Sequence, residues 1–429
     1  MRINRDKYLN DLIIREGNGL IKIVTGPRRC GKTYLLFDLF VDHLRESGVE
    51  EDHIIRIALD DEENAALRDP SALSGFLKQR VYDTQSRFYV LLDEVQYTMS
   101  PGELKSDEPP RLYGVLNGLL RRRNVDVYVT GSNSKLLSTD VLTEFRGRGD
   151  EVRVRPLGFS EFMQVYQGDV YHGWADYVTY GGMPLVAFMS SDEQKARYLE
   201  NLFEETYLKD IIARNGVSRT RELEDLVDVL ASAIGSLTSV GKLEATFKSS
   251  LKSKISYNTI NSYIGFLKDS FIVDESQRYD VKGRKLIGAV RKYYFEDMGL
   301  RNARLGFRQV EETHIMENIV YNELRARGYL VNVGAVEERF RREDGKVGRK
   351  QLEVDFVATK GSERFYIQSA FRLPTPEKIA QEKAPLLRVD DSFPKIILVR
   401  DVVKPLHDEN GILTMDVLDF LLDPRALAV

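Results

Sequence analysis

Cysteine is almost absent from this sequence. Cys30 is the single cysteine among 429 residues, so no internal disulfide can form, as is usual in a reducing compartment. No run of about 18 apolar residues occurs, so no membrane-spanning helix is expected. The N-terminal residues lack the apolar core of a signal peptide. These absences predict a cytoplasmic protein that does not partner with a membrane.

An excess of positive charge is also missing. The 62 Lys and Arg residues are outnumbered by 66 Asp and Glu residues, which gives a formal net charge of −4. Contact with nucleic acid would therefore need a local basic patch. With 42% hydrophobic and 30% charged residues, the composition is typical of a globular protein. The length predicts roughly two or three domains.

A glycine-rich motif near the N-terminus carries the clearest functional signal. Residues 26–33 read Gly-Pro-Arg-Arg-Cys-Gly-Lys-Thr and fit G-x-x-x-x-G-K-[ST], the Walker A phosphate-binding loop. A strand is predicted before the motif at 20–25, and a helix after it. Glycines let the backbone approach phosphates, and the helix N-terminus directs N–H groups at them. We expect the cofactor ATP on these residues: Gly26, Pro27, Arg28, Arg29, Cys30, Gly31, Lys32, Thr33 and Tyr34.

A buried strand that ends in two carboxylates is the second signal, of Walker B type. Residues 87–94 form a nearly continuous apolar run, typical of a central parallel strand, and end in Asp93 and Glu94. Ligands bind at this edge of open α/β sheets. We predict that Thr33 and Asp93 hold Mg²⁺. Lys32 would neutralise the β- and γ-phosphates, and Glu94 would be the general base for the attacking water.

Polar and basic residues that follow complete the predicted catalytic set. The strand expected at 125–133 ends in Ser132 and Asn133, which would orient the water or contact the γ-phosphate. The alternative is a simple turn, since Ser and Asn are common in turns. Arg146 and Arg148 precede another strand and are candidates for an arginine finger, which stabilises charge on the transferring phosphoryl group. The alternative for both arginines is a solvated basic loop.

The pattern of predicted elements changes over residues 219–300 and indicates a separate module. Three helices and a hairpin are expected here, with helices at 221–234, 240–251 and 256–267 and strands at 271–273 and 285–287. Such an arrangement is typical of a winged helix, a variant of the DNA-binding helix-turn-helix. The same module also serves protein interaction, so DNA and an unidentified protein both stay open as partners. The candidate DNA contacts are Lys254, Tyr257, Asn258, Asn261, Lys282, Arg284 and Lys285.

The order of these motifs resembles that of the AAA-type P-loop ATPases. More closely, the chain resembles a bacterial and archaeal ATPase family in which an AAA core precedes a C-terminal domain related to the PD-(D/E)xK nuclease fold. The matching stretches are 26–33, 91–96, 130–137, 145–148, 156–162, 180–184, 207–211 and 317–324. The resemblance covers nearly the whole chain and implies ATP binding and hydrolysis.

The C-terminal residues match that nuclease fold only in part. An active enzyme of this type holds Mg²⁺ and an attacking water with a helix Glu, a strand Asp and a Glu-x-Lys on the next strand. Glu317 and Asp355 fit this pattern, but Gln368 stands at the third position and Ala370 at the lysine position. The resemblance therefore implies an inactive, nuclease-like remnant. Two neighbouring lysines are candidates to replace the missing one, namely Lys350 and Lys360.

These interpretations together give an α/β fold class with four parts. We expect an AAA-type P-loop core with a parallel sheet at 1–155, a helical lid at 156–218, the winged-helix-like module at 219–300 and the nuclease-like domain at 301–429. The predicted function is a Mg²⁺-dependent ATPase, a hydrolase whose nucleotide cycle moves the appended domains, on DNA or a protein.

Two alternative functions stay open. One is a nucleotide-gated DNA-binding or defence switch that hydrolyses ATP slowly or not at all. The other is an ATP-gated, Mg²⁺-dependent DNA nuclease. A homo-oligomer is a further expectation, because an arginine finger acts either within the chain or across a subunit boundary.

Overall fold

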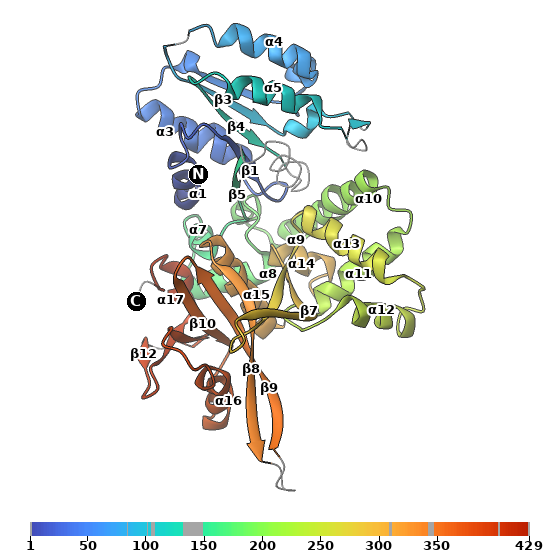
Figure 1. Ribbon diagram of the computed structural model, residues 1–429, viewed down its shortest axis with the longest axis vertical. Coiled ribbons are helices and arrows are strands. Elements are labelled where there is room, and N and C mark those ends of the chain that lie inside the picture. Colours follow the sequence, from blue (N-terminus) through green and yellow to red (C-terminus); the bar gives the residue numbers. More distant parts are fainter. Residues whose placement is uncertain are drawn as a thin grey trace. The chain divides into compact units, whose positions relative to one another are not determined.

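The chain forms two compact units, each with its own sheet (Figure 1). The computed structural model describes residues 2–83, 85–100, 102–103, 108–131, 149–308, 311–341, 347–401 and 404–427. The first unit comprises Met1–Pro156 with Asp269–Phe271, and the second comprises Leu157–Lys268 with Ile272–Val429. Among the described residues, no helix combines the length and the apolar character needed to cross a membrane.

The first unit is built on a five-stranded, all-parallel sheet in the order β2-β3-β4-β1-β5. The strands are β1 (Ile21–Thr25), β2 (Ile54–Ala58), β3 (Phe88–Asp93), β4 (Val125–Thr130) and β5 (Gly149–Arg153). Every residue of β1, β3 and β4 is buried, as expected for central strands covered on both faces. Strands β1, β3 and β4 lie close to the positions predicted for them, 20–25, 87–94 and 125–133.

Helices cover both faces of this sheet. Successive residues of β1 face opposite ways, so Ile23 belongs to one apolar core and Val24 to the other. The first core includes α4 (Pro70–Arg80) and α5 (Arg111–Leu120). The second includes α1 (Asp6–Ile13) and the continuous helix formed by α2 (Lys32–Tyr34), the π-helical η1 (Leu35–Phe40) and α3 (Val41–Glu46). Short 3₁₀ turns complete the unit: η2 (Glu51–His53), η3 (Glu62–Arg68) and η4 (Val95–Thr98).

The second unit begins with a series of helices. They are α7 (Phe159–Met163), α8 (Val170–Tyr180), η7 (Val186–Phe188), α9 (Asp192–Asn201), η8 (Leu202–Leu208), α10 (Lys209–Asn215), α11 (Thr220–Ser232), α12 (Val240–Ser249) and α13 (Tyr257–Asp269). Helix α8 ends at Tyr180, directly before Gly181 and Gly182. The last three helices correspond to those predicted for the winged-helix-like module.

An eight-stranded sheet follows, in the order β12-β13-β11-β10-β9-β8-β6-β7. Its strands are β6 (Val273–Asp280), β7 (Lys285–Phe295), β8 (Leu330–Arg341), β9 (Val347–Lys360), β10 (Glu363–Ala370), β11 (Lys395–Val399), β12 (Leu406–His407) and β13 (Ile412–Asp416). The helices that accompany it are α14 (Met298–Arg304), α15 (Glu312–Ala326), α16 (Pro376–Leu387) and α17 (Val417–Leu422). Strands β8 and β9 continue as a long two-stranded ribbon (Figure 1).

The predicted wing is part of this sheet. The hairpin β6–β7 forms where the sequence places it, but its strands are longer than expected. Strand β6 also pairs in parallel with β8, from Arg278 opposite Val333 to Asp280 opposite Ala335. The predicted boundary at residue 300 therefore does not separate two sheets.

Asp297 fastens the segment predicted as a lid to the rest of the second unit. It caps α14 by accepting a hydrogen bond from the Leu300 N–H at 3.0 Å, and it accepts another from the Gly182 N–H at 2.7 Å. A Cβ on Gly181 (φ +72°) would lie 2.3 Å from Asp297 Oδ1, so glycine is required there. Burial raises the pKa of the Asp297 carboxyl to about 6. The residues of α8 thus end at a turn that is fixed by α14.

Candidate active site

The Walker A residues form a tight loop between β1 and α2. Gly26 (φ +145°) and Gly31 (φ +96°) have backbone conformations that favour glycine. A Cβ on Gly26 would lie 2.1 Å from the carbonyl oxygen of Val154, which follows β5. Cys30 is buried, and burial raises the pKa of its thiol. The cysteine is therefore a protonated packing residue of the loop, not a reactive thiolate.

The side chain of Lys32 turns back onto the phosphate loop. Its side chain is only 3% exposed, and Nζ donates to the carbonyl oxygens of Gly26 at 3.1 Å and Pro27 at 2.8 Å. The same Nζ is 4.0 Å from Glu94 Oε1. The ammonium is thus held at the phosphate loop and beside the second predicted motif.

Asp93 and Thr33, predicted together as Mg²⁺ ligands, are in direct contact. The Thr33 hydroxyl donates to Asp93 Oδ2 at 2.7 Å, and the Thr130 hydroxyl donates to Asp93 Oδ1. Burial raises the pKa of Asp93, although both hydrogen bonds oppose the shift. Hydroxyl and carboxylate oxygens are the hard ligands that Mg²⁺ takes. These residues fit a magnesium ion.

Thr130 was not among the predicted site residues. Besides its bond to Asp93, its hydroxyl oxygen accepts a hydrogen bond from the Glu94 N–H at 2.9 Å. The signal for it was indirect: Val129 pairs with Leu92, so the next residue on each of these parallel strands reaches the same edge. A buried threonine at the end of a strand next to Asp93 is therefore a natural partner for that carboxylate.

Glu94 follows β3 in a left-handed backbone conformation. Its φ of +50° is uncommon for a residue other than glycine, and such conformations cluster at functional sites. The Gln96 side chain donates to Glu94 Oε2. Gln96 thus contacts one oxygen of the Glu94 carboxylate, and the other oxygen, Oε1, is the one near Lys32.

Arg5 was also absent from the predicted set. Its guanidinium is buried and donates to the carbonyl oxygens of Cys30 at 3.1 Å and Arg155 at 2.7 Å. It also lies over the ring of Tyr8, whose hydroxyl accepts from the Arg155 N–H. Arg5, directly before α1, thus links the backbone of the phosphate loop to that of the segment after β5. No local pattern in the sequence marks such an arginine.

Four predicted residues lie outside the part of the chain that the structure describes. They are Ser132, Asn133, Arg146 and Arg148. Their assigned roles in orienting water and in an arginine finger stay predictions.

The three nuclease-like residues also come close together, in the second unit. Glu317 on α15 is 7% exposed and Gln368 on β10 is 8% exposed. The Asp355 N–H on β9 donates to Gln368 Oε1 at 3.2 Å. Lys292 on β7, which the sequence did not indicate, lies 2.8 Å from Glu317 Oε1 and 3.7 Å from Asp355 Oδ1, measured from Nζ.

Neither lysine considered as a replacement belongs to this cluster. Lys360 Nζ donates to the carbonyl oxygen of Arg327 at 2.9 Å, and Lys350 is exposed on β9. The cation of the cluster comes instead from a strand more than twenty residues before Glu317 in the sequence.

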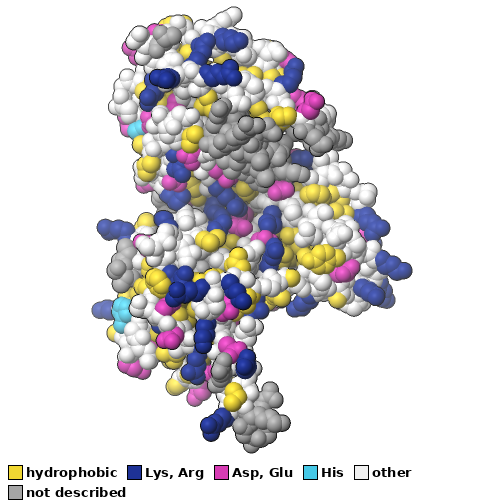
Figure 2. Space-filling model, in the orientation of Figure 1, with side chains coloured by type: hydrophobic (Ala, Val, Ile, Leu, Met, Phe, Trp, Pro, Cys, Tyr) yellow, Lys and Arg dark blue, Asp and Glu magenta, His cyan; other side chains and the backbone are white. Residues whose placement is uncertain are grey.

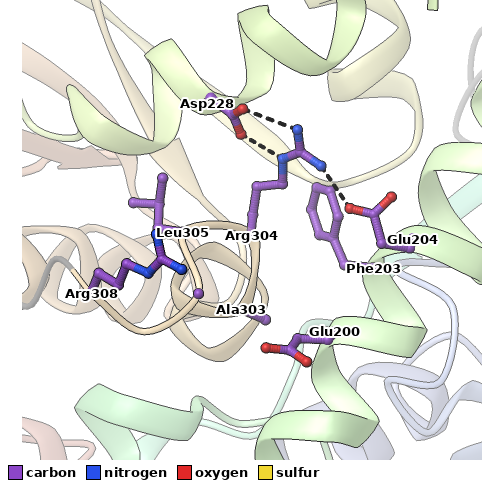
Figure 3. Close-up of a pocket in the computed structure, with 9 residues that line it drawn as sticks. Glu200, Phe203, Glu204, Asp228, Ala303, Arg304, Leu305 and Arg308 are labelled. Atoms are coloured by element: carbon purple, nitrogen blue, oxygen red, sulfur yellow. Dashed lines mark hydrogen bonds and ion pairs between the residues drawn. The ribbon is translucent and has the colours of Figure 1, made fainter. Parts of the chain in front are cut away.

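A pocket of about 550 Å³ lies elsewhere in the second unit (Figure 3). One of its two arginines, Arg304, donates to Glu204 Oε1 at 2.6 Å and to both oxygens of Asp228. Figure 3 shows this guanidinium directed at the two carboxylates. Because its charge is balanced within the chain, Arg304 is a poor anchor for an anionic ligand.

Comparison with known proteins agrees with the first unit's architecture. The family model of an AAA domain matches residues 18–163, and that of a domain of unknown function, DUF8612, matches 171–311. A Haemophilus influenzae protein named "Uncharacterized protein" is 30% identical over 425 residues, which is 98% of each chain. The chain belongs to the same family as this protein. The AAA domain of this chain includes the phosphate loop and the two carboxylates at the end of β3, Asp93 and Glu94.

A second curated protein and a solved structure are less similar to this chain. The "Uncharacterized protein MJ1544" of Methanocaldococcus jannaschii is 27% identical, over 92% of this chain and 86% of its own. The Walker-type ATPase PABY2304 of Pyrococcus abyssi has a solved structure that covers 71% of this chain and 96% of its own. It is 16% identical, with a TM-score of 0.47. The DUF8612 model matches residues 171–311 of this chain. It therefore spans the predicted boundary at 218–219 between the lid and the winged-helix-like module.

Proposed function

We propose that the AAA domain binds ATP with Mg²⁺ and hydrolyses the β–γ bond. The observation that carries this proposal is the 2.7 Å contact between Thr33 of the phosphate loop and Asp93 at the end of β3. Two segments that sequence patterns assign to the phosphates and to the metal thereby meet at one point. Lys32 and Glu94 lie at the same edge of the sheet.

Each side chain has a role that its chemistry supports. The loop N–H groups and Lys32 would bind the β- and γ-phosphates. Thr33 and Asp93 would hold Mg²⁺, which neutralises charge on the phosphate oxygens when it is bound. Glu94 would take the proton of the attacking water. Thr130 and Arg5 are positioning residues, because they act on Asp93, Glu94 and the loop backbone.

Replacing Glu94 by Gln tests this assignment. We expect ATP turnover to fall by about 10²- to 10⁴-fold, because the amide cannot accept the proton, while nucleotide binding is kept. Turnover is measured by phosphate release and binding by a fluorescent ATP analogue. The matched control is Glu63→Gln, an exposed glutamate after β2, which should leave both quantities unchanged.

The same measurements separate the two nucleotide hypotheses. Wild-type turnover equal to that of Glu94→Gln, with turnover well above background, would refute Glu94 as the general base. Background turnover in both proteins, with nucleotide tightly retained, supports the slowly hydrolysing switch instead.

We further propose that the nucleotide state changes the contacts of the second unit with DNA or a protein. The seven candidate DNA contacts on α13, the turn before it and the β6–β7 hairpin are all exposed, which supports their availability to a partner. Figure 2 shows Lys and Arg side chains mixed with Asp and Glu side chains on the visible face. Binding to DNA would therefore depend on a local patch, and its strength would fall steeply with salt.

A further inference from the structure

Lys292 is a buried lysine at the centre of the nuclease-like residues. Its side chain is only 3% exposed. Its Nζ lies 2.8 Å from Glu317 Oε1, 2.7 Å from Glu353 Oε1 and 3.7 Å from Asp355 Oδ1. One ammonium from β7 thus contacts carboxylates from α15 and β9. This is the place that a divalent cation occupies in the metal-dependent nucleases that the sequence resembles.

The oxygen atoms that would ligate a metal already accept hydrogen bonds from the chain. Glu317 Oε1 accepts from the Tyr294 hydroxyl at 2.7 Å as well as from Lys292. Asp355 Oδ2 accepts from the Ser369 N–H at 2.9 Å. Gln368 Oε1, the third ligand position, is taken by the Asp355 N–H. Such hydrogen bonds alone do not exclude a metal, but the Lys292 ammonium already lies between these carboxylates, so the residues present do not fit a divalent cation as they stand.

The charge of the ammonium is firmly held. Burial alone would lower the pKa of Lys292, but the carboxylates of Glu317, Asp355 and Glu353 outweigh it and raise the pKa. Burial acts to raise the pKa of Glu317, yet Lys292 and the neighbouring donors lower it overall. A second, divalent charge would have to enter beside a lysine that stays protonated, and like charges in a buried site repel strongly.

We propose that Lys292 occupies the cation position of the nuclease-like site, so that the native chain binds no divalent metal there. The lysine belongs to β7, which is tied to α15 by Tyr294 and Glu317, and it cannot diffuse away as an ion does. Removing it leaves Glu317, Glu353 and Asp355 without their shared cation. The Glu353 side chain is 34% exposed, which gives an ion a route from solvent. A divalent-cation site therefore appears when the lysine is lost.

The test is a titration of the full chain with Mn²⁺, without nucleotide, followed by electron paramagnetic resonance of the free ion. We expect Lys292→Met to bind one more Mn²⁺ per chain than the wild type. The double variant Lys292→Met/Asp355→Asn should lose it. Lys285→Met, an exposed lysine on the same strand, should match the wild type. Mn²⁺ should also raise the unfolding temperature of Lys292→Met, but not that of the wild type.

Two results overturn the proposal. One is a well-folded Lys292→Met protein that gains no Mn²⁺. The other needs no change at Lys292: if the wild type binds one Mn²⁺ more than Asp355→Asn does, the native cluster is itself a metal site. Mn²⁺ bound at the phosphate loop is removed from the measurement by adding Asp93→Asn to every protein compared. Both comparisons should then give the same differences in bound Mn²⁺.

Discussion

The buried carboxylates of the two units have different hydrogen-bonding and ionic partners. In the first, Asp93 is surrounded by the hydroxyls of Thr33 and Thr130. In the second, Glu317 and Asp355 surround the ammonium of Lys292. A hydroxyl oxygen has lone pairs and can ligate a metal beside the carboxylate, whereas an ammonium only donates. The partners of a carboxylate, more than the carboxylate itself, thus decide whether a cation can bind.

The largest expected effect is on stability, in the second unit. Glu317→Ala should lower the free energy of unfolding by about 3–5 kcal/mol, because it removes a principal partner of a buried charge. Fluorescence of Trp174, the single tryptophan of the chain and a buried residue of α8, reports urea unfolding of this unit. The control is Glu312→Ala at the exposed start of α15. Equal midpoints for the two variants would show that Lys292 does not depend on Glu317.

In the first unit the corresponding substitution should affect activity and not stability. Asp93→Asn should lower ATP turnover by at least about 100-fold, since an amide is a weaker Mg²⁺ ligand than a carboxylate. Because burial raises the pKa of Asp93, the charged form is disfavoured in the fold, and a neutral side chain should unfold at the same temperature or above. Asp60→Asn, exposed after β2, is the control. A strongly destabilised Asp93→Asn protein would remove the contrast with Glu317.

A smaller effect concerns the pH dependence of the second unit. Burial raises the pKa of Asp355 to about 7, although Lys292 opposes the shift. The native state then binds more protons than the unfolded state between about pH 4 and 7, so stability falls as the pH rises. The pKa of His314, raised by the Glu317 carboxylate 3.9 Å from its Nδ1, acts in the same direction. The lowered pKa of Glu317 acts only below about pH 4.5.

Asp355→Asn removes the titrating carboxyl and should flatten this dependence. Between pH 5 and 7 the wild type should lose about 2 kcal/mol more than the variant, measured by urea unfolding at each pH. Asp390→Asn, an exposed residue of the same unit, should keep the wild-type slope. Parallel slopes for wild type and Asp355→Asn would mean that Asp355 is ionised throughout this range.

Much of the first site could be predicted because its parts follow local rules. A glycine motif, an apolar run and the common edge of parallel strands were enough to bring Thr33 and Asp93 together. Thr130 needed one more step, namely the register of β3 with β4. The π-helical segment after the loop had no signature in the sequence.

The cluster in the second unit could be predicted only in part, because its members come from segments far apart. Glu317 and Asp355 were found through a resemblance, but Lys292 lies on a hairpin assigned to another module. Its position depends on how β7 packs against α15 and β9, which no periodicity reveals. Arg5 is a similar case, since its partners are backbone carbonyls far along the chain. Helix α16 was missed altogether.

The pairing of β6 with β8 has a consequence for how the protein avoids aggregation. If the chain lacked the hairpin, β8 would present unpaired N–H and C=O groups between Val333 and Ala335. Bare strand edges of this kind recruit other strands and start intermolecular sheets. The β6–β7 hairpin covers that edge and ends the sheet with β7, whose exposed residues lie in its first half and include Lys285 and Gly288. It therefore keeps this part of β8 from pairing with strands of other chains, whatever else its basic turn contacts.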